Sequence, residues 1–190
     1  MIGDNIIINR KIKMKLTNKQ KGELGEILVS MELMNMGLDV ININTVYRNY
    51  KNADLICMNA NNGKSVMIQV KSGTTHNILT GYISEVDGMI PNLETSVIGP
   101  WVFVYMPDDK MSNMEFYILT REEVIELISS SNKWYATEYY RELKKKYPVG
   151  IEIEWLKGKS SKATKLHPEY KSTLHQPSKD NWYKITELLD

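Results

Sequence analysis

Two short apolar segments joined by an asparagine-rich turn constrain the fold of this chain more than any other feature. The first segment, 55–58, follows Asp54, and the second, 65–68, leads into the run Gln69-Val70-Lys71. The linking residues 59–63 read Asn-Ala-Asn-Asn-Gly. Asn-Asn and Asn-Gly pairs favour tight two-residue turns because they tolerate positive φ. The whole stretch therefore predicts an antiparallel β-hairpin.

The position of the turn decides which side chains share a face of the hairpin. A turn at 61–62 places Asp54 opposite Gln69, and a turn at 62–63 places Asp54 opposite Lys71. Directly opposed residues project from the same face, and side chains alternate along a strand with a period of two. Both registers thus predict that a carboxylate, a carboxamide and an ammonium group converge. A three-residue loop would instead send Asp54 to the other face.

A helix is predicted upstream of the hairpin, from about residue 18 to residue 36. Thr17 and Gln20 match a capping box at its start, and Gly37 stands where a glycine commonly follows a helix end. Apolar residues recur at helical spacing and predict one buried stripe, made of Leu24, Ile27, Leu28, Met31 and Met34.

Gly22 and Gly25 lie inside this predicted helix, where each costs roughly 1 kcal/mol relative to alanine. A helix that contains two such glycines usually has a close neighbour, such as a strand or a phosphate backbone. Glu26 lies near the edge of the apolar stripe, so it can point either toward the hairpin or into water.

The order of these segments resembles the PD-(D/E)XK nuclease superfamily over roughly residues 17–72. The helix opens with Gly-Glu-Leu-Gly-Glu at 22–26, and the chain then presents the motif residues Glu26, Asp54, Gln69 and Lys71. Two positions depart from the family pattern, since Ala53 replaces a proline and Gln69 replaces an acid. The resemblance implies an α/β fold with a restriction-endonuclease-like core, in which α-helices flank a central mixed β-sheet.

The resemblance also implies an activity: a Mg²⁺-dependent endonuclease of restriction or defence type that hydrolyses DNA phosphodiester bonds. Mn²⁺ can substitute for Mg²⁺ in such enzymes. By the resemblance, Glu26, Asp54, Gln69 and the backbone carbonyl of Val70 bind the metal, and Lys71 attends the attacking water. Oxygen ligands of this kind suit Mg²⁺. Cutting both DNA strands needs two sites, so a symmetric homodimer is a further expectation.

Two other interpretations of the same residues stay open. Without the family pattern, Asp54 is an ordinary turn residue, and Gln69 and Lys71 form the solvated face of a hairpin. With the fold but without catalysis, the chain is an inactive DNA-binding or protein-interaction module. The replacement of an acid by Gln69 favours this last alternative.

Length and composition set the remaining bounds. A chain of 190 residues predicts one domain at 1–190, with a nuclease-like core at 17–130 and a C-terminal extension of helices and loops at 131–190. We expect a cytoplasmic protein, because neither a membrane-spanning run nor a signal peptide is recognisable. The lone Cys57 lies in an apolar strand and is expected to be a buried thiol.

Charge is balanced overall, at a net +1, but basic residues gather in two stretches, 10–21 and 157–184. Such stretches are compatible with binding the phosphates of DNA, although lysine-rich loops are commonly just solvated. Rings that could stack on bases, or more commonly pack against the sheet, are offered by Trp134, Tyr135, Tyr139 and Tyr140.

The rest of the chain continues the mixed pattern. Strands are predicted at 39–43, 101–106 and 114–119, the last two as a hairpin, and a second capping box at 120–123 begins a helix. The polar range 73–100 predicts a loop with at most a short helix. Later segments predict, in order, a helix at 134–146, an edge strand at 151–155 and a short terminal helix that docks through Trp182 and Ile185.

Overall fold

The computed structural model describes residues 16–47, 50–107, 113–140 and 145–190. A five-stranded sheet with the order β1-β2-β3-β5-β6 forms the centre of the molecule. Its strands are β1 (Asp39–Asn42), β2 (Leu55–Met58), β3 (Ser65–Gly73), β5 (Trp101–Tyr105) and β6 (Glu115–Leu119). β3 and β5 run parallel, whereas the other neighbouring pairs are antiparallel, so the sheet is mixed.

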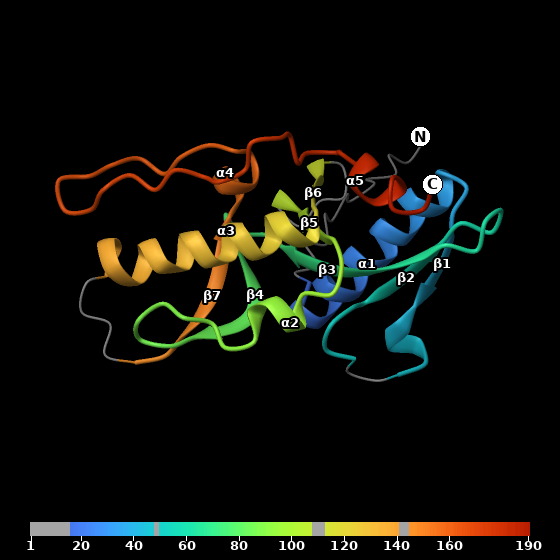
Figure 1. Ribbon diagram of the computed structural model, residues 1–190, viewed down its shortest axis with the longest axis horizontal. Helices are drawn as coiled ribbons and strands as arrows, with labels where there is room; N and C mark the ends of the chain where they lie inside the picture. The colour runs from blue at the N-terminus through green and yellow to red at the C-terminus, as the bar shows by residue number, and fades with distance from the viewer. Residues whose placement is uncertain (1–15, 48–49, 108–112, 141–144) are drawn as a thin grey trace, which may run out of the picture.

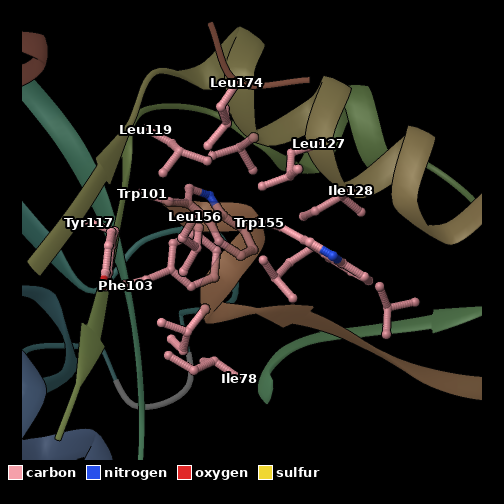
Figure 2. Packing of buried hydrophobic residues seen from close by; sticks show 14 of the residues in the cluster. Ile78, Trp101, Phe103, Tyr117, Leu119, Leu127, Ile128, Trp155, Leu156 and Leu174 are labelled. Atoms are coloured by element: carbon pink, nitrogen blue, oxygen red, sulfur yellow. The ribbon is translucent and has the colours of Figure 1, made fainter. Parts of the chain in front are cut away.

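The two faces of this sheet bury two separate hydrophobic clusters. On one face, Leu28 and Leu33 of α1 (Asn18–Asn35) share a cluster with Ile68 on β3. On the other face, α3 (Arg121–Trp134) supplies Leu127, Ile128 and their neighbours, as Figure 2 shows. The predicted central mixed sheet flanked by helices is confirmed.

A second, two-stranded sheet pairs β4 (Asn77–Ser84) with β7 (Tyr147–Glu152). β4 lies in the range 73–100, so the prediction of a loop there is wrong, although the short helix α2 (Leu93–Ser96) was expected. The strand register shifts in the middle of β4, where Gly81 has a φ of +91°. This irregularity breaks the regular alternation by which a strand is recognised in a sequence.

The ends of α1 lie where the sequence predicted them. Thr17 and Gln20 form a complete capping box, with the Gln20 side chain accepting a hydrogen bond from the Thr17 backbone N–H at 2.9 Å. Met36 caps the other end, and Gly37 follows with a φ of +82°. The predicted bounds of this helix are therefore confirmed.

The face that α1 buries differs from the predicted stripe. Ile27, Met31 and Met34 are 53%, 51% and 51% exposed, so their predicted burial is wrong. The helix instead buries a neighbouring face, formed by Gly25, Leu28, Val29 and Leu33. The choice of face follows from the close contact between Gly25 and β3.

Gly25 has the close neighbour that was expected, and Gly22 does not. A Cβ added to Gly25 would lie 2.7 Å from Cβ of Ser72, which is closer than real Cβ atoms approach. A Cβ added to Gly22 would meet nothing within 4 Å among the described residues. Gly25 therefore lets α1 lie directly against the end of β3, and that approach sets where Glu26 lies.

The second half of the chain follows the prediction in part. β5 and β6 form the expected hairpin, and α3 begins with the expected capping box at Thr120. The helix predicted at 134–146 ends early, because α3 continues only through a π-helical turn, η4 (Tyr135–Tyr139), and residues 145 and 146 are not helical. Residues 141–144 of that prediction lie outside the described residues.

The strand predicted at 151–155 lies earlier in the chain, since β7 begins at Tyr147 and ends at Glu152, and α4 (Ile153–Leu156) follows. Trp155 of α4 joins the cluster against α3 (Figure 2). The terminal helix α5 (Tyr183–Thr186) buries Ile185 completely, as predicted. The division of the chain near residue 130 stays a prediction. Within the described ranges, no helix has the length and apolar character that a membrane span requires.

Candidate active site

The β2–β3 hairpin adopts the first of the two predicted registers. Leu55 pairs with Ile68 in the antiparallel ladder. Continuing the ladder by one residue places Asp54 opposite Gln69, as a turn at 61–62 requires. The Asp54 backbone N–H also donates to the carbonyl of Ile68, at 2.9 Å. Asp54 therefore stands directly before β2, beside the middle of β3.

The carboxylate of Asp54 is buried and held by three donors. Its Oδ2 accepts hydrogen bonds from the side-chain amide of Gln69 and from the backbone N–H of Val70, the latter at 2.8 Å. Its Oδ1 accepts from Nδ2 of Asn44 at 3.2 Å. A buried carboxylate is costly unless its oxygens are hydrogen-bonded, so these donors hold Asp54 in one orientation.

Glu26 reaches the same network from α1. Its Oε2 accepts from Nδ2 of Asn42 at 2.7 Å, and its Oε1 accepts from Nδ2 of Asn44 at 3.3 Å. Burial raises the pKa of Glu26, the hydrogen bond from Asn42 opposes that shift, and the charge of Asp54 adds to it. The Asn44 amide therefore bridges two carboxylates that lie close enough to repel each other.

A tight turn after β1 positions both asparagines. Asn42 ends β1, and its Oδ1 accepts from the backbone N–H of Asn44 at 2.9 Å, which turns the chain into η1 (Ile43–Thr45). Short amide side chains commonly form such turns with the backbone two residues on. The sequence interpretation missed both residues. The available signal was an Asn-x-Asn run at the end of a predicted strand.

Lys71 lies on the same strand as Gln69, two residues on. Its Nζ lies 5.3 Å from the ring centroid of Trp101, within the range of a cation–π contact. Burial lowers the pKa of Lys71, while the charges of Asp54 and Glu26 oppose that shift. The charges of both carboxylates therefore act on the ammonium group, and the convergence of Lys71 with Asp54 and Gln69 stays a prediction.

The oxygen atoms that this network offers as ligands suit a hard divalent ion. Glu26 and Asp54 supply carboxylate oxygens, and Gln69 and the backbone of Val70 carry neutral carbonyl groups. Mg²⁺ prefers oxygen ligands and usually keeps several waters, so a site with two acids is sufficient. Across the described ranges, no three or more His, Cys, Asp or Glu residues gather into a metal-binding group.

One contact differs from the arrangement that a metal would need. The Gln69 side chain directs its NH₂ group at Asp54, whereas metal binding requires its carbonyl oxygen. Rotation of the amide by half a turn exchanges the two groups. Cys57 takes no part in this network, because it is fully buried and burial raises its pKa to about 11.

The second basic stretch carries less open charge than the sequence suggested. Residues 10–15, half of the first stretch, lie outside the described residues. In the second, Lys157 and Lys159 pair with Glu154 at 3.1 and 3.5 Å. Lys184 is buried and lies 2.6 Å from Glu123. Much of the second stretch is therefore neutralised within the protein.

No protein-family model and no curated protein matches this chain. Among solved structures, it is similar to that of the bacterial homing endonuclease I-Ssp6803I. The TM-score is 0.48 at 16% sequence identity, and the match covers 92% of this chain and 95% of that chain. A likeness this distant assigns no residue roles and no activity. Function therefore has to be inferred from the side chains of this chain.

Proposed function

We propose that this protein is a Mg²⁺-dependent endonuclease that hydrolyses DNA phosphodiester bonds. The observation that carries the proposal is the single network in which Glu26 of α1 and Asp54 before β2 meet Gln69 of β3 through hydrogen bonds. Lys71 lies close enough for both carboxylate charges to act on it. Two acids and an amide in one network, with an amine on which both acids act, are the groups that metal-assisted phosphodiester hydrolysis uses.

Each residue has a distinct role in this proposal. Asp54 and Glu26 bind the divalent ion, and Gln69 and the carbonyl of Val70 complete its protein ligands. When bound, the ion lowers the pKa of a water and offsets charge on the phosphate. The Val70 N–H donates a hydrogen bond to Oδ2 of Asp54 and so fixes the orientation of this carboxylate.

Lys71 acts on the attacking water and on the charge that develops at phosphorus. As an ammonium, it stabilises negative charge on the phosphate oxygens in the transition state. As a neutral amine, it can accept a proton from the water. Burial favours the amine and the two carboxylates favour the ammonium, so the balance between these forms is set inside the site.

A cleavage assay tests the proposal directly. Purified protein with Mg²⁺ or Mn²⁺ should cut DNA, and Lys71→Ala should lower the rate by at least about 10²-fold, the usual loss when a transition-state charge partner is removed. Lys64→Ala is the matched control, because Lys64 is an exposed lysine directly before the same strand. It should cut at the wild-type rate.

Folded protein that leaves linear, circular and branched DNA intact with both metals would contradict the proposal. A restriction or defence role is its narrower form, and protection of cells against phage or foreign plasmids would test it. A homodimer is the arrangement proposed for double-strand cleavage, and sedimentation with cognate DNA would test that part.

A catalytically inactive DNA-binding module is the second candidate. The contact in which Gln69 donates to Asp54 favours it, as does the lack of a three-residue metal-binding group of His, Cys, Asp or Glu within the described ranges. It predicts DNA binding that weakens steeply with salt and does not respond to Mg²⁺. Calorimetry separates the two candidates. Heat of Mg²⁺ binding that is lost in Asp54→Asn supports the enzyme, and no heat in the wild type supports the module.

A further inference from the structure

A cavity of about 470 Å³ lies between α3, η4, β7 and the chain that follows α4. Figure 1 shows α4 and β7 in the half of the molecule away from β1 and β2. None of the proposed catalytic residues lines this cavity. Its volume falls within the range of about 300–1,000 Å³ that is typical of small-molecule sites.

Aromatic rings make up much of the cavity lining. They include Trp134, Tyr135, Tyr139, Tyr140, Trp155 and His167. The ring centroids of Tyr139 and His167 lie 3.9 Å apart, and those of Trp134 and Tyr139 lie 5.3 Å apart. These rings pack against one another, and the open volume lies beside them. Such a lining favours a flat ligand that stacks.

The backbone next to the cavity is irregular. The turn η4 has a π-helical hydrogen bond, in which the backbone N–H of Tyr140 donates to the carbonyl of Tyr135 at 2.8 Å. π-Helical turns are rare and frequently occur at functional sites. This turn presents three tyrosines to the cavity, from positions 135, 139 and 140.

Several nitrogen atoms of the residues around the cavity are buried and make no hydrogen bond within the described part of the chain. Within the described residues, Nε1 of Trp134, Nε1 of Trp155 and Nδ1 of His167 are buried without a hydrogen-bond partner. Unmade hydrogen bonds on buried groups are costly and rare in folded proteins. Glu152 adds a carboxylate acceptor to the lining, and the exposed Lys162 adds a cation. A ring with polar edges and an attached phosphate would match this carboxylate and this cation.

We propose that this cavity binds a nucleobase, stacked among its rings. The proposal rests on the proposed nuclease function in one respect, since that function favours an unpaired or extruded base of a DNA strand as the source. A free nucleotide presents the same chemistry. Bases stack on aromatic side chains with little dependence on sequence, and extrusion from a duplex is easiest at mismatched or unpaired positions. The cavity would then recognise such positions at a distance from the cleaved bond.

Binding is measured without metal, so that no cleavage intervenes. Deoxynucleoside 5′-monophosphates are titrated into the full chain in EDTA while tryptophan fluorescence is recorded, with deoxyribose 5-phosphate as the ligand that lacks a base. We expect saturable quenching by the nucleotides alone. Tyr140→Ala should weaken their binding by about tenfold or more, as expected when a stacking ring is lost.

Tyr183→Ala is the matched control variant. Tyr140 is 53% exposed and Tyr183 is 65% exposed, so neither substitution threatens the core, and Tyr183 lies on α5 outside the cavity. Its nucleotide affinity should equal that of the wild type. Absence of quenching by every nucleotide, or equal affinity in the two variants, would overturn the proposal.

Competition identifies the source of the base. Duplexes with one unpaired base should displace the nucleotide, whereas fully paired duplexes should not. Nucleotide binding that no DNA displaces assigns the cavity to a free nucleotide. Nucleotide binding without DNA cleavage supports the nucleobase site and contradicts the proposed nuclease function. DNA cleavage without nucleotide binding supports the nuclease function and contradicts the nucleobase site.

Discussion

The candidate active site and the aromatic cavity use polar groups in opposite ways. In the active site, Asp54 has three donors and Glu26 has two, so both carboxylates are held in place. In the cavity, two indole nitrogens and one imidazole nitrogen are buried without partners among the described residues. The carboxylates of the first region make their hydrogen bonds within the protein, whereas three buried nitrogens around the second region make none among the described residues.

The difference indicates that the two regions are preorganised for a ligand in different ways. Catalysis requires reacting groups within a few tenths of an ångström of their working positions, and a satisfied network supplies that precision. Binding of a flat ring requires open space between rigid walls instead. Variants that disturb the active-site network should therefore change metal binding and stability and leave the cavity unaffected.

Gln69→Glu should give the largest effect on stability. Gln69 is 6% exposed and donates to Asp54, so a glutamate there places two buried carboxylates together. An uncompensated buried charge costs about 3–5 kcal/mol, and we expect a loss of about 3 kcal/mol in the free energy of unfolding in EDTA. Saturating Mg²⁺ should recover most of it, because binding at 100 times Kd contributes about 2.7 kcal/mol.

Chemical denaturation with and without Mg²⁺ measures this difference. Gln20→Glu is the matched control, because a capping box accepts glutamate in place of glutamine. Its stability should change little and should not depend on Mg²⁺. A Gln69→Glu protein with unchanged stability in EDTA would mean that position 69 and Asp54 do not share one buried site, which would remove the basis for the metal site.

Asn44→Ala tests the bridge between the two carboxylates. In this proposal Asn44 is a positioning residue. Its side-chain amide donates hydrogen bonds to both Glu26 and Asp54, and so holds the two carboxylates at a fixed spacing. Loss of a residue that orients metal ligands typically costs 10–100-fold in metal affinity or activity, and we expect a weakening of about that size for Mn²⁺. Asn61→Ala, at an exposed turn position, should bind Mn²⁺ like the wild type.

Calorimetry with Mn²⁺ and no DNA gives this comparison without reference to cleavage. Nucleotide binding in the aromatic cavity should be the same in both variants. Equal Mn²⁺ affinity in Asn44→Ala and the wild type would show that the bridge has no positioning role.

Local signals in the sequence predicted the parts of the site that depend on short-range geometry. The asparagine-rich turn favoured two-residue turns, and both registers that follow from them placed Asp54 with Gln69 and Lys71; one of these is observed. The capping box at Thr17 fixed the start of the helix that carries Glu26. Such features depend on residues two to four positions apart, and one sequence displays them completely.

Features that depend on distant contacts were missed. β4 pairs with β7, about seventy residues later in the chain, and its bulge at Gly81 conceals the strand pattern. The buried face of α1 was misjudged because contact with Ser72 decides it, and that contact outweighs the weak apolar stripe. Asn42 and Asn44 gain their role only when α1 lies beside β1. Each of these is a property of the assembled fold rather than of a local segment.

Gly25→Ala and Gly22→Ala test the placement of α1 with a matched pair on one helix. A Cβ at position 25 would lie 2.7 Å from Cβ of Ser72 and 2.9 Å from its Oγ, so the helix has to move away from β3. Overpacking of this kind costs about 1–3 kcal/mol, and the movement should also displace Glu26 and weaken Mn²⁺ binding. Position 22 has open space, so alanine there should stabilise the protein by about 0.5–1 kcal/mol and leave Mn²⁺ binding unchanged. Thermal unfolding and Mn²⁺ calorimetry on both variants decide the matter. If both alanines stabilise the protein equally, α1 does not lie against β3 at Gly25, and the position assigned to Glu26 is wrong.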